Sequence, residues 1–257
     1  MISKNKIKYL KSLEMKKHRQ AESVFVAEGP KIVGDLLNAG FEATYLAVVE
    51  CSDFASRLQN FDLNGVQIDF VTADDLRKVS SLEAPQQVLA VLKQPIWQLD
   101  SNIASKELCL ALDEVQNPGN LSTIIRLAAW FGIEHLFCSK GCADVYNSKT
   151  VQATMGGLAH VKVHYVDLVE MIGNLPDSTP VYGTFLDGEN LYGKQLEQRG
   201  LIVMGNEGRG VSKEVENLVT EQLFIPNYPA ERESTESLNV AIATAITCSE
   251  FRRRYPL

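Results

Sequence analysis

The chain has 257 residues, of which 45% are hydrophobic and 22% are charged, a composition typical of a soluble globular protein with room for two domains. No apolar run reaches about 18 residues and no signal-peptide core is present, so the pattern argues against a membrane or secreted protein. The five cysteines are odd in number and scattered, which favours reduced thiols, and we expect a cytoplasmic protein.

Charge is unevenly distributed along the chain. The net charge is −7, but residues 1–20 carry seven basic residues against one acid, a local charge of +6 that leaves −13 on the remainder. A basic segment on an acidic body can dock phosphates, whereas Ile7, Leu10 and Leu13 at helical spacing fit a solvated amphipathic helix. Charge alone leaves both interpretations open. The basic residues are Lys4, Lys6, Lys8, Lys11, Lys16, Lys17 and Arg19.

Residues 1–93 alternate between short helix and strand patterns, which predicts a small α/β domain. Pro30 and Gly40 bound one predicted helix, and we expect Ser52 and Thr72 to cap two others. The expected helices are 3–18, 30–39, 52–59 and one that begins at Thr72, and the expected strands are 24–27, 43–49, 66–71 and 87–92.

Residues 94–106, with Pro95 and several polar side chains, predict a linker to a second domain, 107–257. Strands and helices alternate in this domain, which predicts a parallel sheet with helices on both faces. The expected strands are 108–112, 135–138, 161–166, 181–185, 202–204 and 223–225, and the expected helices are 121–131, a short one from Ser148, 167–175 and 238–254.

The stretch Ile202-Val-Met-Gly-Asn-Glu-Gly-Arg-Gly-Val211 is the most informative part of the second domain. A short apolar run enters a glycine-rich turn, and glycine allows the backbone to approach a ligand closely. An amide, a carboxylate and a guanidinium lie between the glycines. Leu223–Pro226 repeats the pattern of a strand that runs into a polar loop, which leads to Glu236-Ser237-Leu238-Asn239 at the start of a helix. We therefore expect one shared site at the carboxyl ends of the strands.

Several known nucleotide and catalytic motifs are absent. The spacing Gly205-x-x-Gly208-x-Gly210 differs from the dinucleotide fingerprint and falls late in the sheet, and there is no P-loop. No nucleophile elbow of the Gly-x-Ser-x-Gly type occurs either. These absences weaken the dehydrogenase, P-loop and serine-hydrolase classes.

Two Cys/His patterns raise the question of a metal site. Cys138-x3-Cys142 has no second Cys or His pair of matching spacing. His160 and His164 lie in a strand-like stretch rather than in a His-Glu-x-x-His helix, so we expect strand residues that face solvent or a polar pocket. We therefore predict no metal.

Three segments together resemble the motifs of the SpoU (TrmH-type) RNA ribose methyltransferases of the SPOUT superfamily. They are Asn117-Pro-Gly-Asn-Leu-Ser-Thr-Ile-Ile-Arg126, Gly205-Asn-Glu-Gly-Arg-Gly210, and Ile225-Pro226 followed by Glu236-Ser-Leu-Asn-Val240. Thr154-Met-Gly-Gly157 also resembles a glycine segment of that family. Phe25-Val-Ala-Glu-Gly29 after a basic helix resembles the ribosomal-protein-L30e-like substrate-binding domain, so the resemblance covers nearly the whole chain.

The resemblance implies an α/β fold with a deep trefoil knot near the C-terminus, an exception to the rule that chains do not thread loops. It also implies a homodimer through the catalytic domain, S-adenosylmethionine as methyl donor and a ribose 2′-hydroxyl as acceptor. The RNA would be 23S ribosomal RNA, with transfer RNA as the alternative. Lys4, Lys8, Lys16, Lys17 and Arg19 would bind it.

The resemblance also implies roles for individual residues. Arg126 would contact the substrate phosphate and help activate the hydroxyl, although a lone helical arginine is most often a surface residue and is a poor base. Asn120 would position its loop, while Glu207, Ser237 and Asn239 would hold the site geometry and the neighbouring subunit's arginine. The expected cofactor residues are Thr184, Phe185, Leu186, Gly205, Asn206, Gly210, Ile225, Pro226 and Leu238.

Two departures from the family pattern bear on substrate choice rather than on chemistry. Ser122 stands where glycine is usual, and the segment 228–236 is longer and more charged than is typical. Two competing functions stay open: a catalytically silent RNA-binding relative, and an enzyme that uses an adenosyl or dinucleotide cofactor on a small molecule. The intact Arg126, Glu207 and Asn239 argue against the first, and the basic N-terminal segment argues against the second.

Overall fold

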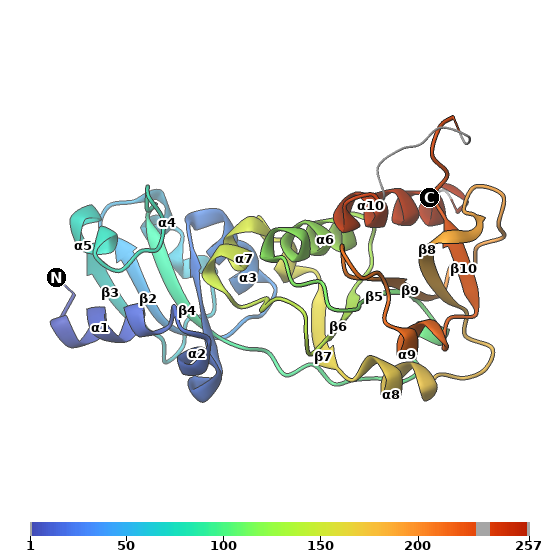
Figure 1. Ribbon diagram of the computed structural model, residues 1–257. Coiled ribbons are helices and arrows are strands. Elements are labelled where there is room, and N and C mark those ends of the chain that lie inside the picture. Colours follow the sequence, from blue (N-terminus) through green and yellow to red (C-terminus); the bar gives the residue numbers. More distant parts are fainter. Residues whose placement is uncertain (1, 230–236, 256–257) are drawn as a thin grey trace. The chain divides into compact units, whose positions relative to one another are not determined.

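The computed structural model describes residues 2–229 and 237–255, so Glu236, which we expected near the start of the last helix, lies outside the described residues. The chain forms two compact units (Figure 1). Residues up to Ile96 and the segment Asp144–His160 form the first unit, and the other described residues form the second. No helix in the described ranges is both long and apolar enough to cross a membrane.

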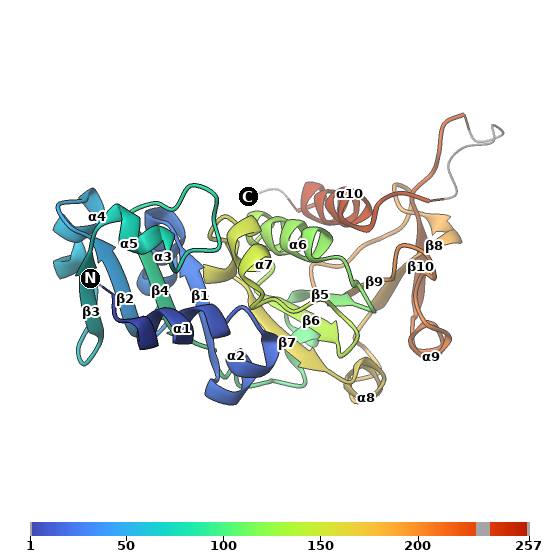
Figure 2. The same cartoon turned by 60° about the vertical axis from the view of Figure 1, so that its left-hand side comes forward.

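The first unit is built on a four-stranded sheet in the order β1-β4-β2-β3. β2 and β3 are parallel, while β4 runs antiparallel to both β1 and β2. Leu10 and Leu13 of the N-terminal segment pack with Leu76 on the sheet face that presents Tyr45 and Val91, and Figure 2 shows α1 in front of this sheet. The strands are β1 Val24–Glu28, β2 Ala43–Val49, β3 Gln67–Val71 and β4 Val88–Lys93, and the helices are α1 Lys4–Ser12, α2 Lys16–Glu22, α3 Pro30–Asn38, α4 Asp53–Ser56, η1 Leu58–Asn60 and α5 Ala73–Arg77.

The predicted N-terminal helix 3–18 is two helices, α1 and α2, so the prediction of one continuous helix is wrong. The break falls at residues 13–15 and has a local cause. The Arg19 guanidinium donates to the main-chain oxygens of Leu13, at 2.8 Å, and Glu14, at 2.7 Å. These two carbonyls are therefore satisfied outside a helix, while Leu13 is buried in the core.

The segment 144–160 packs in the first unit, although its position in the chain lies inside the predicted second domain. It contains α7, Ser148–Ala153, and the single turn η3, Gly157–Ala159. Asp144 pairs with Arg19 at 2.6 Å, and the ring of Tyr146 lies 4.9 Å from that of Phe25. Gly156 has φ +92°, a conformation that favours glycine, and it lies against the Asp35 side chain of α3.

The second unit is a six-stranded sheet in the order β10-β8-β9-β5-β6-β7, with every neighbouring pair parallel. The central strands β5 and β9 are buried along their whole length, as apolar runs in a sheet covered on both faces require. The prediction of a parallel α/β sheet is confirmed. The strands are β5 Leu108–Leu112, β6 His135–Ser139, β7 Lys162–Val166, β8 Val181–Asn190, β9 Gly200–Met204 and β10 Glu221–Phe224.

Helices cover both faces of this sheet, with α6 and α10 on one side and α8 and α9 on the other (Figures 1 and 2). On the second face, Leu168 and Met171 of α8 pack with Val215 of α9 against Phe137 and Val203. The helices are α6 Pro118–Trp130, α8 Leu168–Gly173, α9 Lys213–Glu216 and α10 Val240–Arg253, with the short turn η2 at Ile103–Ser105.

α6 begins at Pro118, three residues before the predicted start at Leu121. Asn117 Oδ1 accepts hydrogen bonds from the main-chain nitrogens of Gly119, at 2.8 Å, and Asn120, at 3.3 Å. Asn117 is thus the N-cap, and Pro118 takes the first helical position, where its missing N–H costs nothing. Residues 118–120, which lie outside the predicted helix, form the first turn of α6.

Candidate active site at the carboxyl edge of the parallel sheet

Side chains from all three sequence motifs meet beyond the carboxyl ends of the strands. Asn120, in the first turn of α6, donates through Nδ2 to the carboxylate of Glu207 in the loop after β9. Asn239, the N-cap of α10, donates through Nδ2 to Asn120 Oδ1 at 3.0 Å. Both the nitrogen and the oxygen of the Asn120 amide are therefore hydrogen-bonded. They link α6 to residues that lie 87 and 119 positions further along the chain.

The loop 205–210 after β9 is a tight hairpin. The main chains of Asn206 and Gly210 exchange two hydrogen bonds, each of 2.9 Å, and Asn206 Oδ1 accepts from the nitrogen of Gly208 at 2.9 Å. A Cβ on Gly205 would lie 2.3 Å from the main chain of Gly210 and Val211. We expected glycine here to admit a ligand, whereas Gly205 is required by the close approach of the loop to itself.

Two acids at the end of β5 anchor this loop. Buried Asp113 accepts through Oδ2 from the main-chain nitrogen of Ser212 at 2.8 Å. Glu114 accepts through its main-chain oxygen from Asn206 Nδ2 at 2.8 Å, and its carboxylate pairs with Arg209. Neither acid is among the residues predicted from sequence for the site. The sequence signal for them is a pair of acids directly after a buried strand. In a parallel sheet, that position lies beside the loop that follows a neighbouring strand.

A cavity of about 740 Å³ lies at this edge, bordered by the tail of β8, the loop after β9, α9 and the start of α10. This volume is in the range of small-molecule sites. Every residue that we predicted to bind a cofactor lines it except Pro226. Glu207 and Ser237 line it as well. The predicted residues on its wall are Thr184, Phe185, Leu186, Gly205, Asn206, Gly210, Ile225 and Leu238, and the wall also includes Asp187, Met204, Arg209, Lys213, Glu216, Val240 and Ala243.

Arg126 does not join the Asn120–Glu207–Asn239 contacts within this chain. It is exposed on α6, six residues after Asn120, which places the two side chains about 120° apart around the helix. Trp130, one turn further along, is 84% exposed on the same side as Arg126. The Arg126 guanidinium makes no hydrogen bond or ion pair within the part of the chain that the structure describes.

The N-terminal basic residues divide into two groups. Lys4, Lys8, Lys16 and Lys17 are exposed and form no ion pair within residues 2–229 and 237–255. Arg19 is 2% exposed and donates to Leu13, Glu14 and Asp144. The prediction that Arg19 binds RNA is therefore not supported, because its guanidinium is committed to the interior of the first unit.

Four of the five cysteines and two of the four histidines, His135 and His164, are buried. The described part of the chain holds no group of three His, Cys, Asp or Glu side chains that could hold a metal ion, and all five cysteines are free. Cys142 donates to the main-chain oxygen of Leu112 at 3.1 Å. Of the two histidines that we expected to face solvent or a polar pocket, His160 is exposed and His164 is buried. His164 stacks on His135, with Nδ1 of His135 and Nε2 of His164 3.1 Å apart, and burial lowers the pKa of His164 to about 4.

Two parts of the chain match known protein families. Residues 107–249 match the SpoU rRNA Methylase family, and residues 4–90 match the MRM3-like substrate binding domain. A 23S rRNA (guanosine(2553)-2′-O)-methyltransferase, RlmP of Bacillus subtilis, is 32% identical over 250 residues, which are 96% of each chain.

Two solved structures resemble the whole chain. An RNA methyltransferase assigned to the TrmH family, from Porphyromonas gingivalis, has a TM-score of 0.88 and 38% identity over 99% of each chain. An AdoMet-bound rRNA methyltransferase from Sinorhizobium meliloti has a TM-score of 0.85 and 26% identity, over 100% of this chain and 97% of that one.

Proposed function

Because this chain belongs to the SpoU rRNA Methylase family, we propose that it transfers a methyl group from S-adenosylmethionine to a ribose 2′-hydroxyl in 23S ribosomal RNA. The similarity to RlmP spans both chains almost completely, so it covers the catalytic and the RNA-binding parts together. The observation that carries the proposal is the contact of Asn120, Glu207 and Asn239 beside the cavity. It brings the three family motifs to one place with their functional groups intact.

The residues around the cavity fit S-adenosylmethionine. One part of the cavity wall is apolar. The side chains of Leu186 and Leu238 there are 70% and 46% exposed, and a flat adenine ring could cover them. The main chain of the loop 205–210 offers peptide groups beside them. The bound cofactor would supply an activated methyl group on a sulfonium centre. Thr184, Leu186, Gly205, Ile225 and Leu238 would hold it, mainly through main-chain and apolar contacts.

The chain's own residues then have to orient the hydroxyl. Glu207 is fixed by Asn120, which Asn239 fixes in turn, so these residues hold the geometry of the site. An arginine is a poor base, so Arg126 acts by docking the substrate phosphate and orienting the ribose, as its permanent charge allows. Ser237, exposed on the cavity wall, lies where it can contact either substrate.

We propose that the enzyme is a homodimer in which Arg126 of one subunit contacts the substrate at the partner's cavity. Ile242 of α10 is 52% exposed, Trp130 of α6 is 84% exposed, and α6 and α10 pack side by side. Exposed apolar side chains on adjacent helices are typical of an interface. Arg126 shares the outer face of α6 with Trp130 and has no partner among the described residues. A second copy that covers this face would explain both features.

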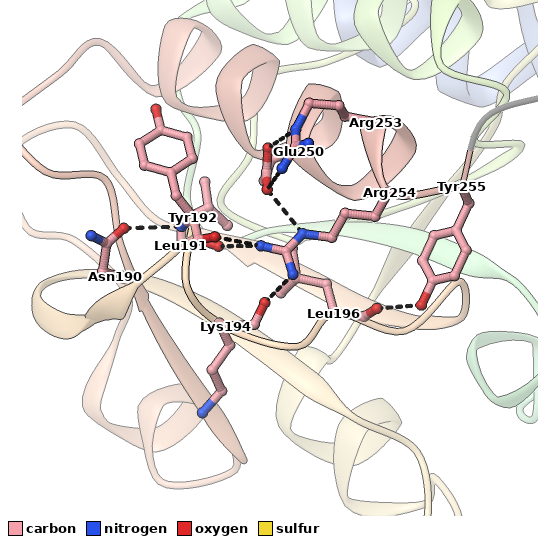
Figure 3. A network of polar contacts seen from close by, with 9 residues as sticks. All are labelled: Asn190, Leu191, Tyr192, Lys194, Leu196, Glu250, Arg253, Arg254 and Tyr255. Atoms are coloured by element: carbon pink, nitrogen blue, oxygen red, sulfur yellow. Dashed lines mark hydrogen bonds and ion pairs between the residues drawn. The ribbon is translucent and has the colours of Figure 1, made fainter.

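We also propose that the C-terminal part of the chain is knotted. The proposal follows from the family to which the chain belongs, and Figure 3 shows the end of α10 held against the segment after β8. Arg254 donates to the main-chain oxygens of Leu191, Tyr192 and Lys194, and its Nε donates to buried Glu250 at 2.9 Å. The last helix is thereby fixed against residues that precede β9 in the chain.

The first unit would recognise the RNA, as its match to a substrate-binding domain indicates. Lys4, Lys8, Lys16 and Lys17 are exposed and unpaired within the described residues, so each can release a counterion on meeting a phosphate. Binding should therefore weaken steeply with added salt. Substitution of one of these lysines by alanine should reduce the salt slope by about one unit.

The test is transfer of labelled methyl from S-adenosylmethionine to RNA from cells that lack this enzyme, followed by nuclease mapping. We expect the label at one ribose of 23S ribosomal RNA. A label in transfer RNA alone would correct the substrate and retain the chemistry. No label in any RNA, with the cofactor still bound, would point to a silent RNA-binding relative or to a small-molecule substrate.

A further inference from the structure

We propose that Glu114 is a positioning residue for the methyl-transfer site, because it holds the loop 205–210 in the shape that borders the cofactor cavity. The inference rests on the proposed function, since it takes the cavity to be the S-adenosylmethionine site. Glu114 is the second residue after β5 and is not itself part of the cavity wall. It acts through Asn206 and Arg209, which are.

The main chain of Glu114 is held in an unusual conformation. Its φ is +54°, in the left-handed region that non-glycine residues rarely adopt. Its N–H donates to Ser139 Oγ at 2.9 Å, and its oxygen accepts from Asn206 Nδ2 at 2.8 Å. The residue is thus fixed between the end of β6 and the loop after β9. Residues held in this region cluster at functional sites, where the surrounding structure maintains them.

The side chain of Glu114 continues the same connection. Its carboxylate pairs with the Arg209 guanidinium, at the far end of the loop from Asn206. A Cβ on Gly141 would lie 3.1 Å from Glu114 Cγ and Oε1, so the glycine leaves the space that this side chain occupies. The Arg209 side chain is 66% exposed, and an ion pair this exposed contributes little to folding. Fold stability alone therefore does not explain a glutamate in this conformation.

The two contacts fix both sides of Glu207. Asn206 and Arg209 flank residues 207 and 208, and Asn206 Oδ1 also accepts from the Arg209 nitrogen at 3.2 Å. Glu207 in turn accepts from Asn120. Release of Arg209 from Glu114 would let the tip of the loop move and would lower the fraction of molecules whose cavity is ready for the cofactor.

Two variants of Glu114 separate positioning from stability. Glu114→Gly removes the carboxylate and relieves the left-handed conformation, so its melting temperature should equal or exceed that of the wild type. Its Kd for S-adenosylmethionine, measured by calorimetry, should nevertheless rise by about 2- to 30-fold, the range for residues that act on a site through a neighbour. Glu114→Gln keeps the shape and the conformation but loses the charge, and its Kd should rise similarly.

The matched control is Cys51→Gly in the first unit. Cys51 is exposed and has φ +56°, so this variant relieves the same conformation without touching the loop. It should leave the Kd for S-adenosylmethionine unchanged. The double variant Glu114→Gln/Arg209→Gln should bind no more weakly than the weaker single variant, because both changes break the same pair.

The possible outcomes are distinct. An unchanged Kd in both Glu114 variants would overturn the inference while leaving the proposed function intact. A melting temperature that falls together with affinity in Glu114→Gly would make Glu114 a structural residue. Additive effects in the double variant would exclude action through Arg209. No binding of S-adenosylmethionine to the wild-type protein would overturn the proposed function and this inference with it.

Discussion

Asn239→Asp should separate the two roles of the Asn239 side chain. Its Oδ1 caps α10 by accepting from the main-chain nitrogens of Ala241, at 3.0 Å, and Ile242, at 3.3 Å, while its Nδ2 donates to Asn120 Oδ1. Aspartate keeps the acceptor and loses the donor. The Asn120 amide cannot turn round to compensate, because its nitrogen already donates to Glu207. One of the two contacts of Asn120 must therefore be lost.

The expected magnitudes follow from these contacts. Aspartate caps a helix as well as asparagine, so Asn239→Asp should melt close to the wild type, whereas Asn239→Ala should cost about 1 kcal/mol, or about 2–4 °C. The Asn239–Asn120 contact is exposed, so water can replace it in the folded protein, and its loss from the transition state should cost about 0.5–1.5 kcal/mol. On that basis kcat/KM for RNA methylation should drop by about 2- to 12-fold in both variants.

The assay combines thermal unfolding with initial rates of methyl transfer to RNA that lacks the modification. The diagnostic result is Asn239→Asp with wild-type stability and low activity. Wild-type turnover in that variant would show that the Asn239–Asn120 contact has no part in catalysis. If Asn239→Asp instead melted as low as Asn239→Ala, the assignment of Asn239 as the cap would be wrong.

Three further predictions follow. Arg126→Ala should abolish methyl transfer with an unchanged melting temperature and Kd for S-adenosylmethionine, because Arg126 is exposed; unaltered turnover would remove its role. Arg19→Met should lower the free energy of unfolding by about 3–5 kcal/mol in denaturant titrations, because it strips Asp144 of its buried partner; a stable variant with weakened RNA binding would restore Arg19 as an RNA ligand. His164 has a folded pKa of about 4 against 6.5, so the unfolded chain binds a proton that the folded chain refuses, and stability should be lost as pH falls from 6.5 to 4. In His164→Phe, the free energy of unfolding lost between pH 6.5 and 4 should be smaller by up to about 3 kcal/mol. Identical pH profiles for the variant and the wild type would contradict this.

The parts of the fold that could be predicted from sequence are those fixed by local patterns. β2 and β5 have the predicted bounds, because each is a nearly unbroken apolar run. Ser52 and Thr72 cap helices as expected, through hydrogen bonds to the third residue along. The short α9 was missed because its four residues, Lys-Glu-Val-Glu, carry no periodicity that could be recognised.

What could not be predicted depends on contacts between distant residues. Arg19 was assigned to RNA because a count of charges does not register burial, and Asp144, its partner, lies 125 residues away. The same contact helps to hold the segment 144–160 in the first unit. No sequence pattern at the predicted linker, 94–106, indicates that a later segment packs with the first domain. Removal of residues 1–93 would therefore strip Asp144 and Tyr146 of their partners. The first domain is not a simple appendage that can be deleted to test RNA recognition.

In the candidate site, the sequence offers no reason why amides recur. The side-chain oxygens of Asn117 and Asn239 cap the start of a helix, and that of Asn206 closes a turn in its own loop. The Nδ2 of Asn206 and of Asn239 then reaches another segment, Glu114 in one case and Asn120 in the other. A carboxylate could do only the first task, because it has no donor. A single amide side chain can thus cap its own segment and also bond a distant one. For this reason three motifs far apart in sequence meet beside the cavity.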